Sequence, residues 1–495
     1  MTGTSPPSAK APLAPRPAKR RTFLKAMGIA AAAGSLPGAL RAQNRSQVLV
    51  IGAGLSGLAA ALLLEQAGAR VRVIEGRNRI GGRVESVREL PGAPESGGTS
   101  FSPGYARLVN AARTHGVELI EVLPMLRYYG KREIFLDGKH IPLADWPDHP
   151  RNPFPADARE TPPWAYLRRF IARANPLKSA DAWLAPENAQ LDVSLFDWLR
   201  SQGVSEDIIR TSYGVEPSHG NTAHEVSALM MLFSASFVDV QRKLVKPGES
   251  PILTAKGGNQ SIPEAMAAAL TNEVELQREV TAIHDAGDRV EVSCADGKVY
   301  KADHVVSSLP CSVLRRIAIS PALPPQQARA FNTLDSQLVN LVHMAYREPF
   351  WQEEGLSPNM FSDGLVSSLV GERKGRDPAG VTSITAWIRG HKAAFLDQIP
   401  EAEARRLVLD DIAKRRPASR GKLEIVAYKS WYRDRFSAGD WAVWQPGQVS
   451  SLSPHVGRAH GRVHFCGEHT ARSNRGMEGA MESGERAAIE ILQAL

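Results

Sequence analysis

Cysteine is scarce in this chain of 495 residues, which contains only Cys294, Cys311 and Cys466. So few thiols exclude a small scaffold that is held together by disulfides. Cys466 lies in an apolar, strand-like stretch, where we expect a buried free thiol. A bridge between Cys294 and Cys311 stays open, because pairing depends on a geometry that the sequence does not give.

Several other signatures are absent from the sequence. His219 and His224 are five residues apart with no third ligand nearby, so we predict no metal site. No Gly-x-Ser-x-Gly nucleophile turn occurs. No apolar run reaches the roughly 20 residues of a membrane span, and no basic run carries interleaved aromatics. We therefore expect no stable membrane span and no nucleic-acid partner.

The net charge of +8 is unevenly distributed. Seven of the 60 basic residues and none of the 52 acidic residues lie within residues 1–42, so the rest of the chain is nearly neutral. Lys19-Arg20-Arg21-Thr22-Phe23-Leu24-Lys25 is followed by a weakly apolar run from Ala26 to Leu40. A basic flank before an apolar stretch with small residues is typical of an export signal.

The paired Arg20 and Arg21 resemble the twin-arginine signal. This resemblance implies that residues 1–42 are a signal, that the export machinery is a partner, and that the protein is periplasmic or exported. The alternative is a basic tail before an ordinary helix, and the cleavage site stays open.

The first chemical motif lies directly after the signal. Gln47–Ile51 is apolar and predicts a buried strand of a parallel sheet. Gly52, Gly54 and Gly57 follow, with Leu55 and Ser56 opening a predicted helix. This pattern allows a tight turn, close approach of a pyrophosphate and close helix–strand packing. Glu75 ends the next predicted strand and is placed to accept hydrogen bonds from a ribose diol.

A second glycine pair indicates which dinucleotide the protein binds. Ile80-Gly81-Gly82-Arg83 follows Glu75 closely and supplies another close backbone approach with a cation beside it. From Glu75 through Arg77, Gly82 and Arg83, the sequence resembles the flavin-dependent amine oxidase family, which includes monoamine, polyamine and L-amino-acid oxidases. The resemblance implies FAD as the cofactor. Carotenoid desaturases and protoporphyrinogen oxidase share much of this pattern.

The resemblance continues to the end of the chain and implies further cofactor contacts. They come from the loop with Gly98 and Thr99, from Val280 against the adenine, from Trp431, and from the final motif with Gly467, Glu468 and Met477. Asp440 stands where covalently flavinylated relatives have cysteine, so we expect non-covalent FAD. The last helix is expected to point its N-terminus at the flavin.

These motifs predict an α/β fold with a discontinuous Rossmann-like FAD-binding domain at 46–125, 251–310 and 431–495. A mixed-sheet and helical substrate domain is expected at 126–250 and 311–430. Alternating residues in 280–306 predict a small antiparallel sheet, with Val299–Val306 as one strand. The segments 338–346, 381–388 and 424–429 are expected strands of the substrate domain.

The implied reaction is oxidation of a primary or secondary amine to an imine, with oxygen reduced to hydrogen peroxide. The family's usual strand lysine is replaced by Leu341, or by Asn340 in a shifted register, and His343 is the only catalytic candidate nearby. Trp441 and Gly476 occupy the positions of a two-tyrosine cage, so half a cage is expected in the substrate pocket. Ser100 replaces an arginine that binds carboxylate in L-amino-acid oxidases, which argues against an α-amino acid.

The missing lysine leaves two alternatives open. One is a flavin dehydrogenase or desaturase that acts on a non-amine substrate or uses an acceptor other than oxygen. The other is an FAD-binding protein without catalysis.

Overall fold

The computed structural model describes residues 46–121, 130–248, 250–373 and 380–495. The expected twin-arginine signal at 1–42 lies outside these residues. Within the described ranges, no helix has both the length and the apolar character needed to cross a membrane. Residues 45–495 form one compact unit, so the expected boundaries between an FAD-binding and a substrate domain stay a prediction.

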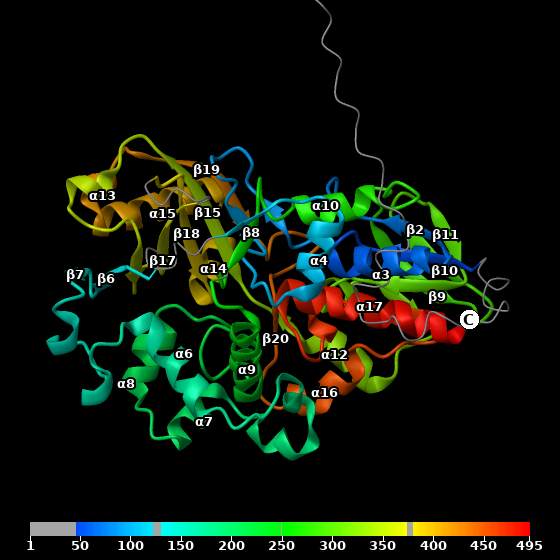
Figure 1. Ribbon diagram of the computed structural model, residues 1–495, viewed down its shortest axis with the longest axis horizontal. Helices are drawn as coiled ribbons and strands as arrows, with labels where there is room; N and C mark the ends of the chain where they lie inside the picture. The colour runs from blue at the N-terminus through cyan, green and yellow to red at the C-terminus, as the bar shows by residue number, and fades with distance from the viewer. Residues whose placement is uncertain (1–45, 122–129, 249, 374–379) are drawn as a thin grey trace, which may run out of the picture. The chain divides into compact units, whose positions relative to one another are not determined.

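The first sheet is parallel and carries the nucleotide motif. Its strand order is β2(Arg70–Ile74)–β1(Gln47–Ile51)–β12(His304–Ser307)–β21(Val463–Phe465). Helix α3(Leu55–Gln66) follows β1 and packs along α17(Gly476–Ala494) (Figure 1). The α/β fold and the buried parallel strand are confirmed.

The second sheet differs from its sequence prediction at one point. Its order is β11(Val299–Ala302)–β10(Val290–Cys294)–β9(Val280–Asp285)–β13(Ala318–Ser320). The expected single strand at Val299–Val306 is wrong, because the chain breaks at Asp303. β11 pairs antiparallel with β10, whereas β12 joins the parallel sheet beside β1. Each piece has only four residues, with apolar residues next to polar ones, so periodicity alone could not separate them.

The third sheet has seven strands, drawn entirely from segments expected in the substrate domain. The order is β19(Leu423–Ser430)–β15(Val339–Tyr346)–β18(Ser383–Arg389)–β17(Ser368–Glu372)–β16(Met360–Ser362)–β6(Glu133–Leu136)–β7(Lys139–Ile141). Val342 and Met344 of β15 point into a core with Val408 and Ile412 of α15(Glu401–Arg415). The opposite face, which carries Leu341, turns toward Trp431 and the cofactor-binding motifs.

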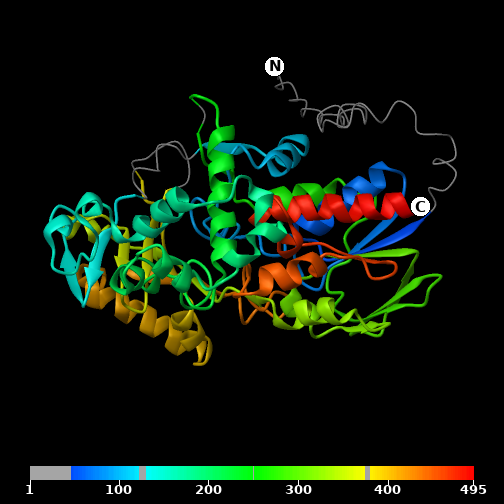
Figure 2. The ribbon, with the colours of Figure 1, turned by 90° about the horizontal axis from the view of Figure 1, so that it is seen from below.

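A helical layer lies on the other side of the molecule's centre from α15. Its main members are α6(Pro163–Ala174) and α9(Ala228–Leu244), which contact each other (Figures 1 and 2), and α6 also packs with the π-helix η5(Arg210–Gly214). Both α6 and α9 bury one apolar side in the largest core.

The remaining α-helices and strands are short. They are α4(Ala106–Thr114), α7(Leu195–Ser201), α8(Glu206–Ile209), α10(Ser261–Ala268), α11(Cys311–Leu314), α12(Pro325–Thr333), α13(Phe350–Glu353), α14(His391–Asp397), α16(Gln448–Val456), β3(Glu85–Ser86), β4(Glu95–Gly97), β5(Leu119–Glu121), β8(Leu253–Ala255), β14(Asp335–Ser336) and β20(Ala442–Val443).

All three cysteines are buried free thiols. The bridge between Cys294 and Cys311 that the sequence left open is therefore not formed, since one thiol ends a strand of the second sheet and the other begins α11. Burial raises the pKa of both Cys311 and Cys466 to about 12, so neither thiol is a nucleophile at neutral pH.

Candidate cofactor and substrate site

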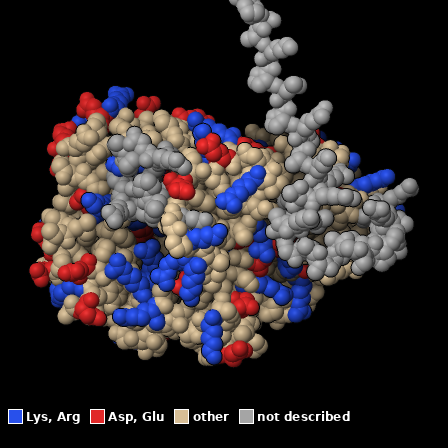
Figure 3. All heavy atoms as spheres, viewed as in Figure 1, with Lys and Arg blue, Asp and Glu red and all other residues tan. Residues whose placement is uncertain are grey.

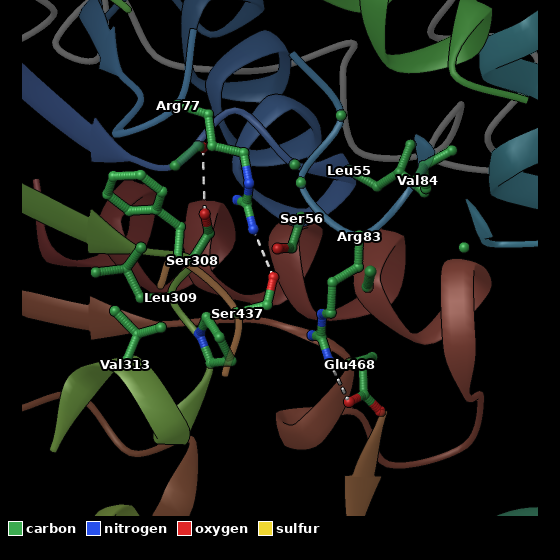
Figure 4. Close-up of a pocket in the computed structure, with 18 of the residues that line it drawn as sticks. Leu55, Ser56, Arg77, Arg83, Val84, Ser308, Leu309, Val313, Ser437 and Glu468 are labelled. Atoms are coloured by element: carbon green, nitrogen blue, oxygen red, sulfur yellow. Dashed lines mark hydrogen bonds and ion pairs between the residues drawn. The ribbon is translucent and has the colours of Figure 1, made fainter. Parts of the chain in front are cut away.

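A large cavity opens at the carboxyl ends of the parallel strands. Ile51 at the end of β1, Glu75 after β2 and Ser308 after β12 line it, and its volume is about 450 Å³. Pockets for small molecules and cofactors commonly measure roughly 300–1,000 Å³. Ligands of open α/β sheets bind at this edge of the strands, so the cavity is the candidate site (Figure 4).

Two glycine segments meet at the floor of the cavity. Gly52 has a φ of +102°, and a Cβ there would lie 2.3 Å from the Ser308 hydroxyl. A Cβ on Gly54 would instead project to 3.8 Å from Cα of Gly82, with nothing nearer. The space beside Gly54 is therefore lined by backbone alone, next to the free N–H groups of the first turn of α3. This arrangement suits a phosphate group.

Glu75 holds the end of β2 against the glycine turn. One carboxylate oxygen accepts a hydrogen bond from Ala53 N at 2.9 Å, and the other accepts from Arg77 N at 2.8 Å. The side chain lines the cavity and is only 5% exposed. A carboxylate has about four acceptor sites, so Glu75 keeps acceptor capacity for a ribose diol.

A partly buried ion pair connects the second glycine pair to the final motif. Arg83 Nη1 lies 3.2 Å from Glu468 Oε1 and also donates to the backbone carbonyl of Asp440 (Figure 4). The same Glu468 oxygen accepts from Ala442 N at 2.8 Å. Arg83 thus bridges two chain segments at the cavity wall.

Asp440 places an unusual carboxyl group in the cavity wall. Its side chain is buried, and burial raises its pKa to about 7, with the nearby carboxylate of Glu468 acting in the same direction and Arg83 opposing both. The group is therefore largely neutral below pH 7 and carries negative charge above it.

Arg77 lines the cavity but turns its guanidinium to the protein. Its Nη2 donates to Asp434 Oδ1 at 2.8 Å and to the Ser437 hydroxyl, and its guanidinium lies over the ring of Phe436 (Figure 4). These partners stabilise the loop after β19.

The end of the cavity farthest from the glycine turn is aromatic. Trp441, Trp387 and Tyr105 line it, together with Gly476 at the start of α17. Burial raises the pKa of Tyr105 to about 12, so its hydroxyl stays protonated at neutral pH. Gly476 has a φ of +57°, and no atom lies within 4 Å of the place where its Cβ would project. One aromatic wall therefore faces open space.

Comparison with known proteins identifies this arrangement. A family model described as flavin containing amine oxidoreductase matches residues 55–492. The chain belongs to the flavin-containing amine oxidoreductase family.

Individual relatives agree with this family. A flavin-containing amine oxidase of Danio rerio is 29% identical over 489 residues, covering 91% of this chain and 87% of the relative. Human flavin-containing amine oxidase B is 28% identical, with coverage of 91% and 87%.

Solved structures share the fold. Putrescine oxidase bound to putrescine superimposes with a TM-score of 0.72 at 25% identity, covering 91% of this chain and 99% of that one. Cyclohexylamine oxidase from Brevibacterium oxydans gives a TM-score of 0.72 at 23% identity, with coverage of 91% and 99%. The protein is an FAD-dependent oxidoreductase.

The residues of this amine oxidase fit an FAD. The glycine cradle beside Gly54 would hold the pyrophosphate, and Glu75 the ribose. Val280 lines the same cavity beside Glu279, where the adenine is expected. None of the described lining residues is a cysteine, so a thioether to the flavin has no donor in this wall.

Most residues predicted from the sequence converge on the cavity. Those that line it are Gly52, Gly54, Leu55, Ser56, Glu75, Arg77, Gly82, Arg83, Gly98, Thr99, Val280, Trp441, Glu468, Gly476 and Met477.

Three predicted contact residues lie one layer behind the cavity wall. A Cβ on Gly57 would lie 2.0 Å from Gly52 O, so this glycine serves the packing of α3 on β1. Trp431 is fully buried, donates from Nε1 to Ser96 O at 2.6 Å, and packs beneath Gly97. Gly467 has a φ of +134° in a buried turn.

Leu341 and His343 are also not among the residues that line the cavity. Leu341 is fully buried with Val339 and Trp431. His343 shares its face of β15, as expected, and bonds to the Ser96 hydroxyl at 3.0 Å and to Thr385 Oγ1 at 3.0 Å. The histidine lies in the sheet and connects it to strand β4 through Ser96.

The loop after β12 was not predicted from the sequence to be part of the site. Its residues Ser308, Leu309 and Pro310 line the cavity, and so does Val313 of α11, which follows the loop (Figure 4). The signal that could have revealed them is their position directly after a parallel strand, where ligands bind. Trp387 gave no such signal, because it reaches the site from the third sheet.

Proposed function

We propose that this enzyme oxidises a primary or secondary amine to an imine, with the amine bound at the aromatic end of the cavity. The observation that carries the proposal is one continuous cavity in a chain of the amine oxidase family. One end has the glycine cradle and Glu75, and the other has Trp441, Trp387 and Tyr105.

Bound FAD supplies the acceptor for a hydride from the carbon next to the amine nitrogen. The protein's own residues bind and orient. Trp441 and Trp387 give flat apolar walls for the carbon skeleton, and the open space at Gly476 leaves room beside them. The hydride donor must be the neutral amine, and the partly buried Arg389 and Arg475 near Trp441 disfavour an ammonium ion by like-charge repulsion.

We propose oxygen as the electron acceptor, with hydrogen peroxide as its product. An acceptor other than oxygen is favoured by one observation. Leu341, at the position of the family's usual lysine, is an apolar side chain buried among tryptophans, and none of the described lining residues is a lysine. The assisted reoxidation that such a lysine provides therefore has no counterpart here.

Two measurements on the purified holoprotein test these proposals. Anaerobic addition of benzylamine, hexylamine and cyclohexylamine in turn is expected to bleach the flavin absorbance. Absence of bleaching with every amine, while dithionite still bleaches it, would contradict amine oxidation. Admission of air then measures reoxidation and peroxide. Slow return of colour in air, together with rapid return with a quinone or a ferricenium salt, would overturn oxygen as the acceptor.

We also propose export through the twin-arginine machinery to the periplasm, supported by Arg20-Arg21 and the apolar run that follows. A reporter fused after residue 42 is expected in the periplasm, and Arg20→Lys with Arg21→Lys is expected to retain it in the cytoplasm. Cytoplasmic retention with both arginines intact would refute the proposal.

A further inference from the structure

Behind Trp441, the wall of the aromatic end is rich in positive charge. Arg389, Arg475 and Arg132 lie in this layer, and Glu216 is the carboxylate that bonds to two of them. Glu216 accepts from Arg389 Nη1 at 3.1 Å and from Arg132 Nη1 at 3.2 Å. The layer thus holds three cations and one anion, and that anion bonds to two of the cations.

Arg475 is the cation without an anionic partner. Its Nη2 lies 2.8 Å from Nε2 of His219, and its Nη1 donates to the hydroxyl of Ser234 on α9. Among the residues that the structure describes, no ion pair joins Arg475 to a carboxylate, and Glu468 acts on it only from a longer distance. Figures 1 and 2 show α9 beside the first turn of α17, where Arg475 precedes the helix.

His219 does not neutralise Arg475. Burial lowers the pKa of His219 well below its ordinary value, and the charges of Arg475 and Arg389 lower it further. The imidazole is therefore neutral, and its Nε2 accepts the hydrogen bond from Arg475. Its ring meets Trp441 edge-on, with 5.8 Å between ring centres.

Arg389 brings a second cation to the same wall. It follows Trp387 by two residues on β18, so both side chains lie on the face of the sheet that borders the cavity. Its guanidinium is 4.7 Å from the Trp387 ring centre and 6.0 Å from that of Trp441. The side chain keeps 18% exposure.

Hydrogen-bond acceptors are scarce in this wall. Nε1 of Trp441 and Nε of Arg389 are both buried N–H groups that have no acceptor among the described residues. The acids nearest to this end belong to the cofactor side, where Glu468 is paired with Arg83 and Asp440 is largely neutral below pH 7. Buried donors without acceptors are costly, so this end favours a ligand that brings one.

Arg475 and Arg389 are not among the described residues that line the cavity, but the charge of Arg475 acts on Tyr105, which does line it. On the cavity side, the open space at Gly476 lies directly beside Arg475 in the chain. On the outer face, Lys and Arg side chains gather over α6, which carries Arg168, Arg169 and Arg173 (Figure 3). Positive surface of this kind raises the local concentration of anions.

We propose that the far end of the substrate cavity selects a monoamine that carries a carboxylate remote from the amine, with Arg475 as the specificity-determining cation. This inference rests on the proposed amine oxidation. A carboxylate in the open space at Gly476 would be attracted by the positive layer behind the wall, and a second ammonium in the same place would meet like charge. At the effective dielectric of a protein interior, one such charge contact changes affinity by roughly ten- to hundredfold.

The test uses two matched substrate series that differ only at the far end. One series is 4-(aminomethyl)benzoate, benzylamine and 1,4-bis(aminomethyl)benzene, and the other is 6-aminohexanoate, hexylamine and 1,6-diaminohexane. The anaerobic bleaching rate of the holoprotein flavin is measured against substrate concentration. We expect efficiency to fall from carboxylate to neutral amine to diamine, by at least about tenfold across a series.

Three variants assign the effect to the charge. Arg475→Gln keeps an amide donor for His219 but removes the charge. It is expected to reduce the difference in bleaching efficiency between the members of a series to about threefold or less. Arg475→Lys restores a cation and is expected to restore the order. Arg472→Gln, which removes an exposed arginine from the same loop, is the matched control and is expected to behave as the unmodified protein.

A binding measurement without turnover complements the kinetics. Benzoate, which has no amine, is expected to perturb the flavin spectrum of the holoprotein and to bind at least about tenfold more weakly to Arg475→Gln. Two results would overturn this inference alone. One is that neutral amines bleach the flavin while diamines and carboxylates do so with equal efficiency. The other is that Arg475→Gln lowers the efficiency equally for all three members of a series. Failure of every amine, with dithionite still effective, would overturn amine oxidation and this inference with it.

Discussion

The Glu75 carboxylate and the Ala53 backbone N–H are joined by a hydrogen bond of 2.9 Å across the top of β1 and β2. The residue that is expected to bind the ribose thus also fixes the glycine turn that is expected to bind the pyrophosphate. Binding of the two parts of the cofactor is therefore coupled through one side chain.

Replacement of Glu75 should weaken FAD binding more than it weakens the fold. Glu75→Ala removes a charged acceptor whose hydrogen bond to a ribose is worth about 1.5–3 kcal/mol, so we expect FAD affinity to fall at least tenfold. Glu75→Gln keeps one acceptor oxygen and should lose less. Titration of the apoprotein with FAD by flavin fluorescence measures both, and equal affinity in all three proteins would contradict the ribose role.

Two glycines three residues apart should give opposite results when changed to alanine. Gly54→Ala places a methyl group in the cofactor space at ordinary contact distance from Gly82, so we expect near-normal stability but at least tenfold weaker FAD binding. Gly57→Ala would put Cβ 2.0 Å from Gly52 O and should destabilise the protein by about 1–3 kcal/mol. Thermal unfolding of the apoproteins and FAD titration separate the two effects. A Gly54→Ala protein that retains FAD normally would argue against the cradle.

The raised pKa of Asp440 predicts how the stability of the folded protein changes with pH. Its folded-state pKa of about 7 exceeds the ordinary value of 3.8, so the folded protein binds a proton that the unfolded chain releases between these values. Stability from this group therefore falls as pH rises from about 4 to 7 and stays low above 7.

The matching variant is Asp440→Asn, which remains neutral throughout. We expect it to raise the free energy of unfolding of the holoprotein more at pH 8 than at pH 5, by about 1–3 kcal/mol. Asp145→Asn, which changes an exposed carboxylate far from the cavity lining, serves as the control. A pH-independent difference between Asp440→Asn and the unmodified protein would contradict the raised pKa.

His343 is expected to be structural. His343→Gln disrupts bonds to Ser96 and Thr385 inside the sheet, and loss of buried hydrogen bonds should destabilise the protein by about 1–3 kcal/mol. The flavin bleaching rate of the folded fraction with a good amine should stay within about threefold. A fall of a hundredfold or more in that rate, with normal FAD content, would instead give this residue a part in catalysis.

The parts of the site that are built from consecutive residues could be predicted from the sequence. The strand, the turn at Gly52–Gly57 and the acid at Glu75 are consecutive, and each has a recognisable pattern. The break at Asp303 was not predictable, because partner choice between two sheets decides it. The cationic wall was equally hidden. His219, Arg389 and Arg475 come from three distant segments, and only the packing of α9, β18 and α17 brings them behind Trp441.

The open space at Gly476 should control how wide a substrate can be. Gly476→Tyr would place a second aromatic opposite Trp441 and narrow the cavity, at a strain of about 1–2 kcal/mol because φ is +57°. We expect the bleaching efficiency for a branched amine such as cyclohexylamine to fall at least tenfold more than that for butylamine. Gly138→Tyr, at another open turn with a φ of +72°, supplies the strain without touching the cavity and should leave both rates unchanged. Equal losses for both amines in Gly476→Tyr would show that the space beside Trp441 does not hold the substrate.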